Sequence, residues 1–361
     1  MHLGTRSLLK FFQAHRDDAS LVLVSITATE GSTYRKPGAM MLISQDNAYE
    51  GMISGGCLEG DLLHHAVDVF AHGRPKSVTY DMHTGDELIW GLGLGCDGVI
   101  HLLLNRLDRD EGFAMLEFIR QSLLSRSPVL LALVTESSRP ELPAGTAGLY
   151  NRAGHSQGHD RLVRHCAGLC GGAWPPWRQQ TLHQDDHALM LINILPPPLI
   201  LLCGAGPDAV PVARQVNALD WECVIADHRP AFARSERFPA GCRVILSRPE
   251  TLHQQLDLGA VDAAVIMSHH LENDASYLRQ LTQHHDGGGL QYIGVLGPAA
   301  RRDRLKEMAQ CPQQAVYGPV GLDIGAELPE SIALAILAEI HAVLNERDGQ
   351  SLTTGPAGLR A

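Results

Sequence analysis

A buried strand followed at once by a glycine-rich turn and a helix is the feature that most constrains this fold. The run Leu199-Ile-Leu-Leu-Cys203 is apolar throughout, and Gly204-Ala-Gly206-Pro-Asp-Ala209 leads directly into a helical pattern. Asp227 ends the next apolar run, near the ~20-residue separation expected of a ribose-binding acid. This arrangement predicts a Rossmann-type unit in which Gly204, Gly206 and Asp227 bind a nucleotide such as NAD(P).

Strand-like and helix-like runs alternate through the rest of this region, to Leu344. Such alternation predicts an α/β fold with a doubly wound parallel sheet. The chain before it mixes strands, a hairpin and helices, which predicts an α+β domain. The stiff run Pro196-Pro-Pro198 separates the two, so we expect domains at residues 1–195 and 196–345, followed by a flexible tail at 346–361. Residues 137–177 are rich in Gly, Pro, His and Arg, and are expected to be irregular or to form a lid.

Composition narrows the classes of partner. The 361 residues carry 40 acidic and 29 basic side chains, a formal net charge of −11, so a nucleic-acid partner is not expected. No apolar run approaches the ~18 residues that span a bilayer, and no signal-peptide core is visible near Met1. We therefore expect a cytoplasmic protein that does not enter membranes, whose eight cysteines are reduced thiols.

A second glycine motif lies in the N-terminal half. Ile53-Ser-Gly-Gly-Cys57-Leu-Glu59 precedes a helical pattern, so Gly55 and Gly56 allow close backbone approach and the helix dipole favours an anion. The same dipole is expected to lower the pKa of Cys57 and to enrich its thiolate, the form that binds metals. The alternative is a buried cysteine that caps a strand-to-helix turn.

A third glycine run, Gly91-Leu-Gly-Leu-Gly95, ends at a second thiol, Cys96. A strand follows it rather than a helix, so no dipole-based phosphate site is expected there. Two glycine-loop thiols in one domain could converge on one thiophilic ligand, although coincidence explains their spacing equally well.

These motifs together resemble the XdhC/CoxI family. In the first half, the resemblance rests on Gly31-Ser-Thr-Tyr-Arg-Lys-Pro-Gly38, Ile53–Gly60 and Gly91–Cys96. In the second half, it rests on Asp227–Phe232, Tyr292–Gly297 and Pro319–Ala326. Two departures are visible: Asp97-Gly98 follows Cys96 where the family usually has Gly-Gly, and residues 137–180 are no family signature and inherit no role.

Members of this family are xanthine dehydrogenase accessory factors, so the resemblance implies an accessory protein rather than a catalyst. It implies binding of molybdenum cofactor, support for replacing an oxo ligand by sulfido with a cysteine desulfurase, and transfer to an apo molybdenum hydroxylase. A homodimer is expected for a factor that serves a dimeric client. Cys57 and Cys96 are the candidates near the metal, since thiolates are soft ligands. The expected pterin or phosphate contacts are Arg35, Lys36, Gly55, Gly56 and Glu59.

Two alternatives remain open from the sequence. The first is an NAD(P)-dependent oxidoreductase that uses Gly204, Gly206 and Asp227, with residues 1–195 as its substrate domain. No acid or base stands out beside the expected nicotinamide, although His269-His270 lies at the carboxyl edge of the predicted sheet. The second is a protein–protein scaffold in which both sites are vestigial.

Overall fold

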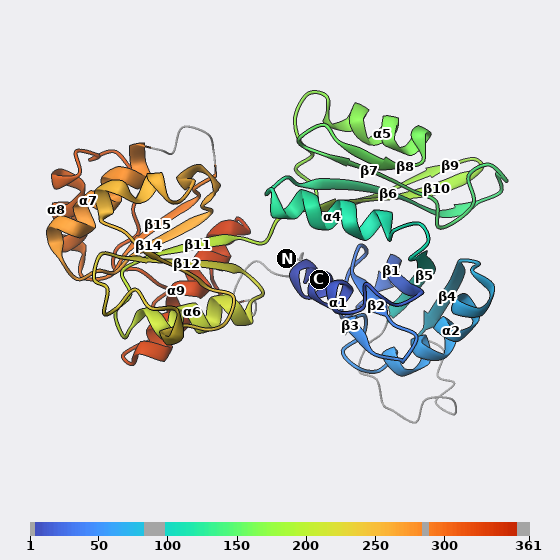
Figure 1. Cartoon of the computed structure of the whole chain (residues 1–361), viewed down its shortest axis with the longest axis horizontal. Helices are drawn as coiled ribbons and strands as arrows, with labels where there is room; N and C mark the ends of the chain where they lie inside the picture. The colour runs from blue at the N-terminus through green and yellow to red at the C-terminus, as the bar shows by residue number, and fades with distance from the viewer. Residues whose placement is uncertain (1–3, 83–97, 284–288, 352–361) are drawn as a thin grey trace. The chain divides into compact units, whose positions relative to one another are not determined.

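A computed structural model describes residues 4–82, 98–283 and 289–351 of the chain (Figure 1). The chain divides into two compact units, residues 2–196 and 197–361, and the break falls in the Pro196–Pro198 run. No helix among the described residues combines the length and the apolar character needed to cross a membrane.

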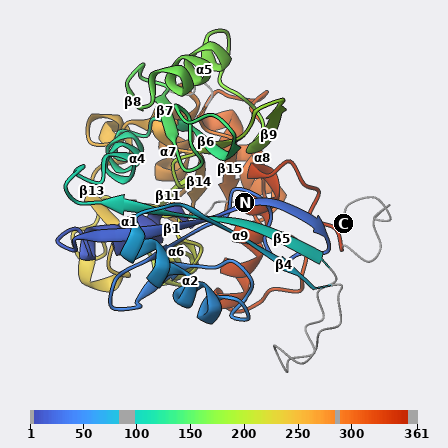
Figure 2. The ribbon, with the colours of Figure 1, turned by 90° about the vertical axis from the view of Figure 1, so that its right-hand side faces the viewer.

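The N-terminal unit contains two antiparallel five-stranded sheets. The first has the order β3-β2-β1-β5-β4, and its long central pair β1 and β5 runs side by side (Figure 2). Its strands are β1 (Ser20–Gly31), β2 (Met40–Ile43), β3 (Tyr49–Gly51), β4 (Lys76–Asp81) and β5 (Gly98–Asp108). The second has the order β8-β7-β6-β10-β9. Its strands are β6 (Val129–Ser137), β7 (Ala147–Asn151), β8 (Ser156–Gly158), β9 (Gln179–Gln184) and β10 (His187–Ile194).

Helices pack on both sheets of this unit and contribute side chains to the apolar cores of the sheets. Its helices are α1 (Thr5–Ala14), α2 (Glu59–His72), α4 (Ala114–Leu124) and α5 (Asp160–Cys170). Helix α2 packs on one face of the first sheet, and α5 packs on the second sheet. Between the two sheets, α1 and α4 share one apolar core with both of them. The expected α+β organisation of this half is therefore confirmed, with sheets and helices in alternating layers.

The expectation of irregular structure at residues 137–177 is wrong. This segment contains β7, β8 and α5, and it completes the second sheet. Gly148, one of the glycines of this segment, lies within β7 where α5 packs so closely that a Cβ would collide with Leu162. Because a glycine at a helix–strand contact looks in sequence like a glycine in a turn, the local pattern did not reveal these elements.

The C-terminal unit is a doubly wound parallel sheet, as the sequence predicted. All five strands are parallel in the order β13-β12-β11-β14-β15. They are β11 (Leu199–Cys203), β12 (Glu222–Asp227), β13 (Arg243–Leu246), β14 (Ala263–Ile266) and β15 (Tyr292–Val295). The helices are α6 (Ala209–Ala218), α7 (Leu271–Gln283), α8 (Ala299–Met308) and α9 (Pro329–Leu344). Short 3-10 turns lie at Ser235–Arg237, Pro249–Gln254 and Leu258–Ala260.

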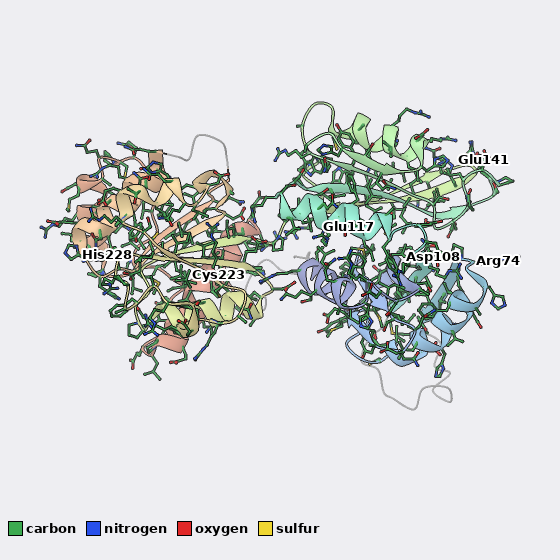
Figure 3. All side chains as sticks on the ribbon, in the orientation of Figure 1. Arg74, Asp108, Glu117, Glu141, Cys223 and His228 are labelled. Atoms are coloured by element: carbon green, nitrogen blue, oxygen red, sulfur yellow. The ribbon has the colours of Figure 1, made fainter. Side chains whose placement is uncertain are left out.

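Separate apolar cores lie on the two faces of this sheet. Helices α6 and α9 contribute to one core, and α7 and α8 contribute to the other. Cys203 is buried in the core that contains α7 and α8, and Cys223 is buried in the core that contains α6 and α9. Figure 3 labels Cys223 on the C-terminal unit. Burial raises the pKa of the Cys203 thiol well above its ordinary value, which suits a small core residue and not a reactive thiol. The carboxyl ends of β11, β12 and β14 lie together at one edge, where doubly wound folds bind their ligands.

Candidate functional site

The loop between β3 and α2 carries the N-terminal glycine motif. Gly55 and Gly56 have φ angles of 79° and 108°, in the region that glycine adopts without strain. Both glycines are exposed, and Cys57 is half-buried at the entrance to α2. The sequence therefore shapes a turn that presents the backbone and one thiol to solvent at a helix N-terminus.

The buried carboxylate of Glu59 holds this loop together. Its Oε1 accepts hydrogen bonds from the Ile53 and Ser54 N–H groups, both at 2.9 Å. Its Oε2 accepts from the Ser54 hydroxyl at 2.7 Å and from the Gly56 N–H at 2.9 Å. The Ser54 Oγ in turn accepts from the Leu58 N–H at 2.7 Å. One side chain at the first position of α2 thus fixes the conformation of the loop that precedes it.

The pKa of Glu59 reflects two opposed effects. Only 3% of the residue is exposed, and this burial acts to raise the pKa. The hydrogen bonds from Ser54 and Ile53 favour the ionised form and together outweigh burial, so the pKa lies below its usual value. Glu59 is therefore an anion at neutral pH, and it lies where the sequence led us to expect a bound phosphate.

The loop at residues 31–38 lies beside the glycine turn. A Cβ added at Gly55 would lie 3.6 Å from the Tyr34 ring, so this largely exposed ring lies beside Gly55. Arg35 is half-buried and Lys36 is exposed in the same loop. The structure thus brings two of the motifs together through Tyr34, which the sequence did not single out. Cys96 and the third glycine run lie outside the described residues.

The structure also brings Gly204, Gly206 and Asp227 together at the carboxyl edge of the parallel sheet. The Ala205 N–H donates to Asp227 Oδ2 at 2.8 Å. Burial opposes ionisation of Asp227, but the hydrogen bonds from Arg229 and Ala205 keep its pKa below the usual value. Two side chains that the motif did not predict also meet here, since His269 Nε2 lies 2.7 Å from Asp208 Oδ2.

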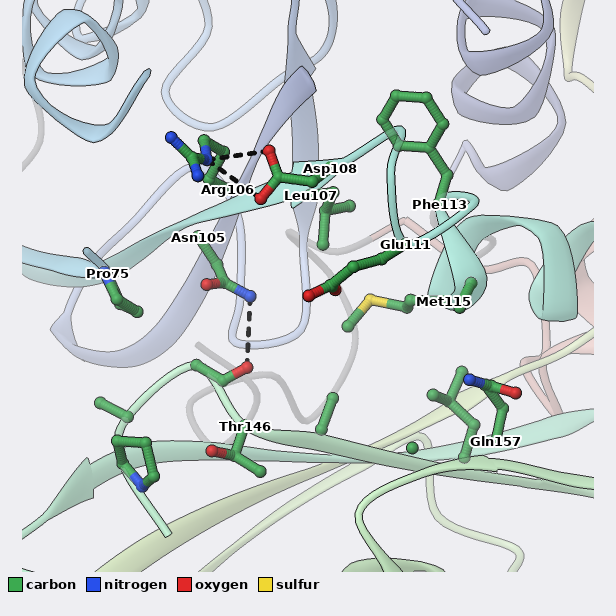
Figure 4. A pocket seen from close by; sticks show the side chains of 17 residues that line it. Pro75, Asn105, Arg106, Leu107, Asp108, Glu111, Phe113, Met115, Thr146 and Gln157 are labelled. Carbon is green, nitrogen blue, oxygen red and sulfur yellow. Dashed lines mark hydrogen bonds and ion pairs between the residues drawn. The ribbon is translucent and has the colours of Figure 1, made fainter. Parts of the chain in front are cut away.

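A separate cavity of about 500 Å³ lies between the two sheets of the N-terminal unit. Figure 4 shows Glu111 and Met115 pointing into it, with Arg106 paired to Asp108 on its wall at 2.9 Å. None of the predicted site residues that the structure describes lines this cavity. Among the described residues, no cluster of three His, Cys, Asp or Glu side chains is placed to hold a metal ion.

Comparison with known proteins connects both motifs to one family. Residues 14–81 match the model of the XdhC and CoxI family, and residues 200–340 match that of the XdhC Rossmann domain. The chain is 33% identical over 335 residues to a protein of Bacillus subtilis that is named a probable xanthine dehydrogenase subunit. The match covers 90% of this chain and 93% of that protein.

Two further relatives cover nearly the whole chain. The molybdenum cofactor insertion chaperone PaoD of Escherichia coli is 23% identical over 348 residues, covering 94% of this chain and 88% of that protein. A crystal structure from Bacillus halodurans, described as a xanthine dehydrogenase, superposes with a TM-score of 0.79 at 27% identity, covering 99% and 100% of the two chains. The resemblance found in the sequence is therefore confirmed, and the chain belongs to the XdhC/CoxI family.

Proposed function

We propose that this protein binds molybdenum cofactor and delivers it to an apo molybdenum hydroxylase of the xanthine dehydrogenase type. The observation that carries the proposal is the loop at residues 53–58, which Glu59 fixes in a shape that presents Cys57 at the start of α2. One relative is named a molybdenum cofactor insertion chaperone, and another is named as part of a probable xanthine dehydrogenase, which supports the assignment of cargo and client.

The chemistry of the loop suits such a cargo. The cofactor joins a pterin and a phosphate to a sulfur-bound molybdenum, so it needs contacts for an anion and a soft ligand for the metal. Cys57 supplies the thiol, and Cys96 is our second candidate near the metal. Arg35 and Lys36 lie in the loop whose Tyr34 ring lies beside Gly55, and they supply positive charge for the phosphate.

Glu59 is a positioning residue in this proposal and not a direct contact of the cargo. Its carboxylate already binds the N–H groups of Ile53, Ser54 and Gly56. Within the described ranges, the Gly55 and Cys57 N–H groups have no hydrogen-bond acceptor, which leaves these two amides for an incoming phosphate. In this proposal Glu59 fixes the conformation of the loop, and Gly55, Gly56 and Cys57 face the cargo.

The remaining parts of the proposal concern partners. Replacement of an oxo ligand on the metal by sulfido requires a sulfur source, which we assign to a cysteine desulfurase. An exposed loop suits transfer, because a cargo held at the surface can be passed to the apo hydroxylase without unfolding of the carrier. We place this exchange in the cytoplasm and expect the carrier to act as a homodimer.

The proposal is tested by transfer of the cargo. The full chain is incubated with molybdenum cofactor released from a donor enzyme, desalted, and mixed with an apo xanthine dehydrogenase whose activity is then measured. We expect the wild-type chain to restore activity, Cys57→Ser to restore little, and Cys170→Ser, a half-buried thiol in α5, to match the wild type. No gain from the wild-type chain over free cofactor would contradict the delivery function.

A further inference from the structure

The crevice of the C-terminal unit lies where the strand order reverses, between β11 and β14. The loop after β11 contains Gly204 and Gly206, and the loop after β14 contains His269. In doubly wound folds this is the position of a bound dinucleotide, with its pyrophosphate against the glycine loop and the next helix. A dinucleotide needs three things here: space above the glycines, free N–H donors and an acid available to the ribose.

The space that the two glycines provide is filled by the chain itself. A Cβ at Gly204 would lie 2.6 Å from the Met267 carbonyl oxygen, so this glycine is needed for close packing of the two loops. A Cβ at Gly206 would lie 2.5 Å from Asp208 Oδ1, so the Asp208 carboxylate occupies that position. The close packing of the chain therefore explains the presence of both glycines without a bound ligand.

Several N–H donors of the loop are engaged as well. Gly204 donates to the Ala226 carbonyl at 2.8 Å, and Ala205 donates to Asp227. At the start of α6, Ala209 donates to the Gly206 carbonyl at 3.2 Å. Pro207 has no N–H group to offer. Within this described loop, the Gly206 and Asp208 N–H groups have no acceptor, so two donors remain for a pyrophosphate, which is normally bound by these backbone groups.

The carboxylates of the crevice oppose a phosphate, although the Arg237 guanidinium donates to the Ala205 carbonyl of the same loop at 2.7 Å. Asp208 lies directly before α6, where the helix dipole would otherwise attract an external anion, and its Oδ2 contacts His269 at 2.7 Å. Asp227 is engaged by Arg229, whose Nε and Nη2 donate to it at 2.9 and 2.7 Å. The Arg229 guanidinium also lies 4.0 Å over the Phe232 ring, which fixes it in this pairing. The acid expected to bind a ribose is therefore already neutralised within the protein.

We infer that this crevice excludes dinucleotides, and that the carboxylate of Asp208 is the group that keeps them out. The glycine loop holds internal anions, Asp208 and Asp227, in place of a pyrophosphate and a ribose. The expected nucleotide-binding role of Gly204, Gly206 and Asp227 thus does not fit the residues around them, and neither does the oxidoreductase alternative. This inference is independent of the proposed cofactor delivery, which uses the other unit.

The test is titration of the full chain with NADH and NADPH, followed by nicotinamide fluorescence and by calorimetry. We expect no saturable binding by the wild-type chain up to about 1 mM. Asp208→Ser removes the charge and keeps a side chain suited to a helix N-terminus, so this variant should gain about tenfold or more in affinity. His269→Ala leaves the carboxylate in place and should still bind nothing. Glu307→Gln, an exposed acid in α8, is the matched control for loss of one charge and should behave as the wild type.

Two results of this titration would contradict the inference or its assignment to Asp208. Saturable wild-type binding in the micromolar range would overturn the inference. Binding by neither the wild type nor Asp208→Ser would show that Asp208 is not the excluding group. Thermal unfolding of each variant, followed by circular dichroism, establishes that it is folded before either result is accepted.

Discussion

Glu59 accepts hydrogen bonds from three of the backbone N–H groups that the glycine turn before α2 would otherwise offer to an anion from solution. In the C-terminal unit, Asp208 lies above Gly206 at the start of α6. In both loops a carboxylate of the chain satisfies backbone groups or fills space that the motif alone assigns to a ligand. At the scale of single residues, the function of such a loop therefore depends on whether a carboxylate of the chain already occupies the position expected for a bound anion.

Substitution of Glu59 by Gln tests whether its charge fixes the loop. The amide nitrogen cannot accept from the Gly56 N–H, so two donors would face each other in a buried position. We expect the free energy of unfolding of the N-terminal unit to fall by about 1–3 kcal/mol. Urea denaturation of the full chain, read by hydrogen exchange of the β1 peptides, measures the change. Glu50→Gln, in the neighbouring strand β3, is the control and should leave stability unchanged.

The difference in unfolding free energy between the wild type and Glu59→Gln should depend on pH in a defined direction. The pKa of Glu59 in the folded chain lies below 4.5, its ordinary value. Its ionised form therefore contributes stability above that value, and this contribution is lost as the pH falls through the folded pKa. The gap between the wild type and Glu59→Gln should be full near pH 7 and should narrow in acid. A gap that stays constant into acid would mean that the charge of Glu59 does not matter.

At the scale of elements, the start of α2 separates two kinds of glycine. Gly56 has a φ of 108°, which is strained for any residue with a side chain, even though nothing lies within 4 Å of an added Cβ. Gly60 lies within the helix, and open space also surrounds its Cβ position. The backbone angle is therefore the main difference between the two positions.

This pair gives a matched prediction. Gly60→Ala should raise the free energy of unfolding by about 0.5–1 kcal/mol, because alanine favours helix and restricts the unfolded chain. Gly56→Ala should lower it by about 1–2 kcal/mol, because a left-handed conformation disfavours a Cβ. The same denaturation experiment measures both variants. Equal effects at the two positions would contradict the description of the loop as a turn that only glycine adopts easily.

The secondary-structure elements differ in how well the sequence predicted them. The strands of the parallel sheet are buried on both faces and therefore appear as short apolar runs, so β11 and β12 were predicted correctly. The helix α5 was missed even though it is amphipathic, with Leu162 and Cys166 buried four residues apart on one side. That spacing is a helical signal, but the Gly, Pro and His residues on either side of it led to the expectation of irregular structure.

At the scale of the whole molecule, the sequence predicted the family and the fold class but not the state of the two glycine loops. The family follows from several motifs in one order, and these are visible along the chain. The engagement of Asp227 by Arg229, and of Gly56 by Glu59, depends on side-chain conformation in three dimensions. The spacing of residues in the sequence cannot distinguish a loop that binds an external anion from a loop that already contacts a carboxylate of the chain. The joint role of Cys57 and Cys96 stays a prediction.

The most direct test of the central proposal is the amount of molybdenum that the full chain retains. Wild type, Cys57→Ser, Cys96→Ser and the control Cys170→Ser are incubated with released cofactor, desalted, and analysed for metal by mass spectrometry. We predict retention by the wild type and the control, and a loss of most of the metal in the other two variants. If Cys57→Ser retains as much molybdenum as the wild type, the loop that Glu59 shapes is not the site that holds the metal.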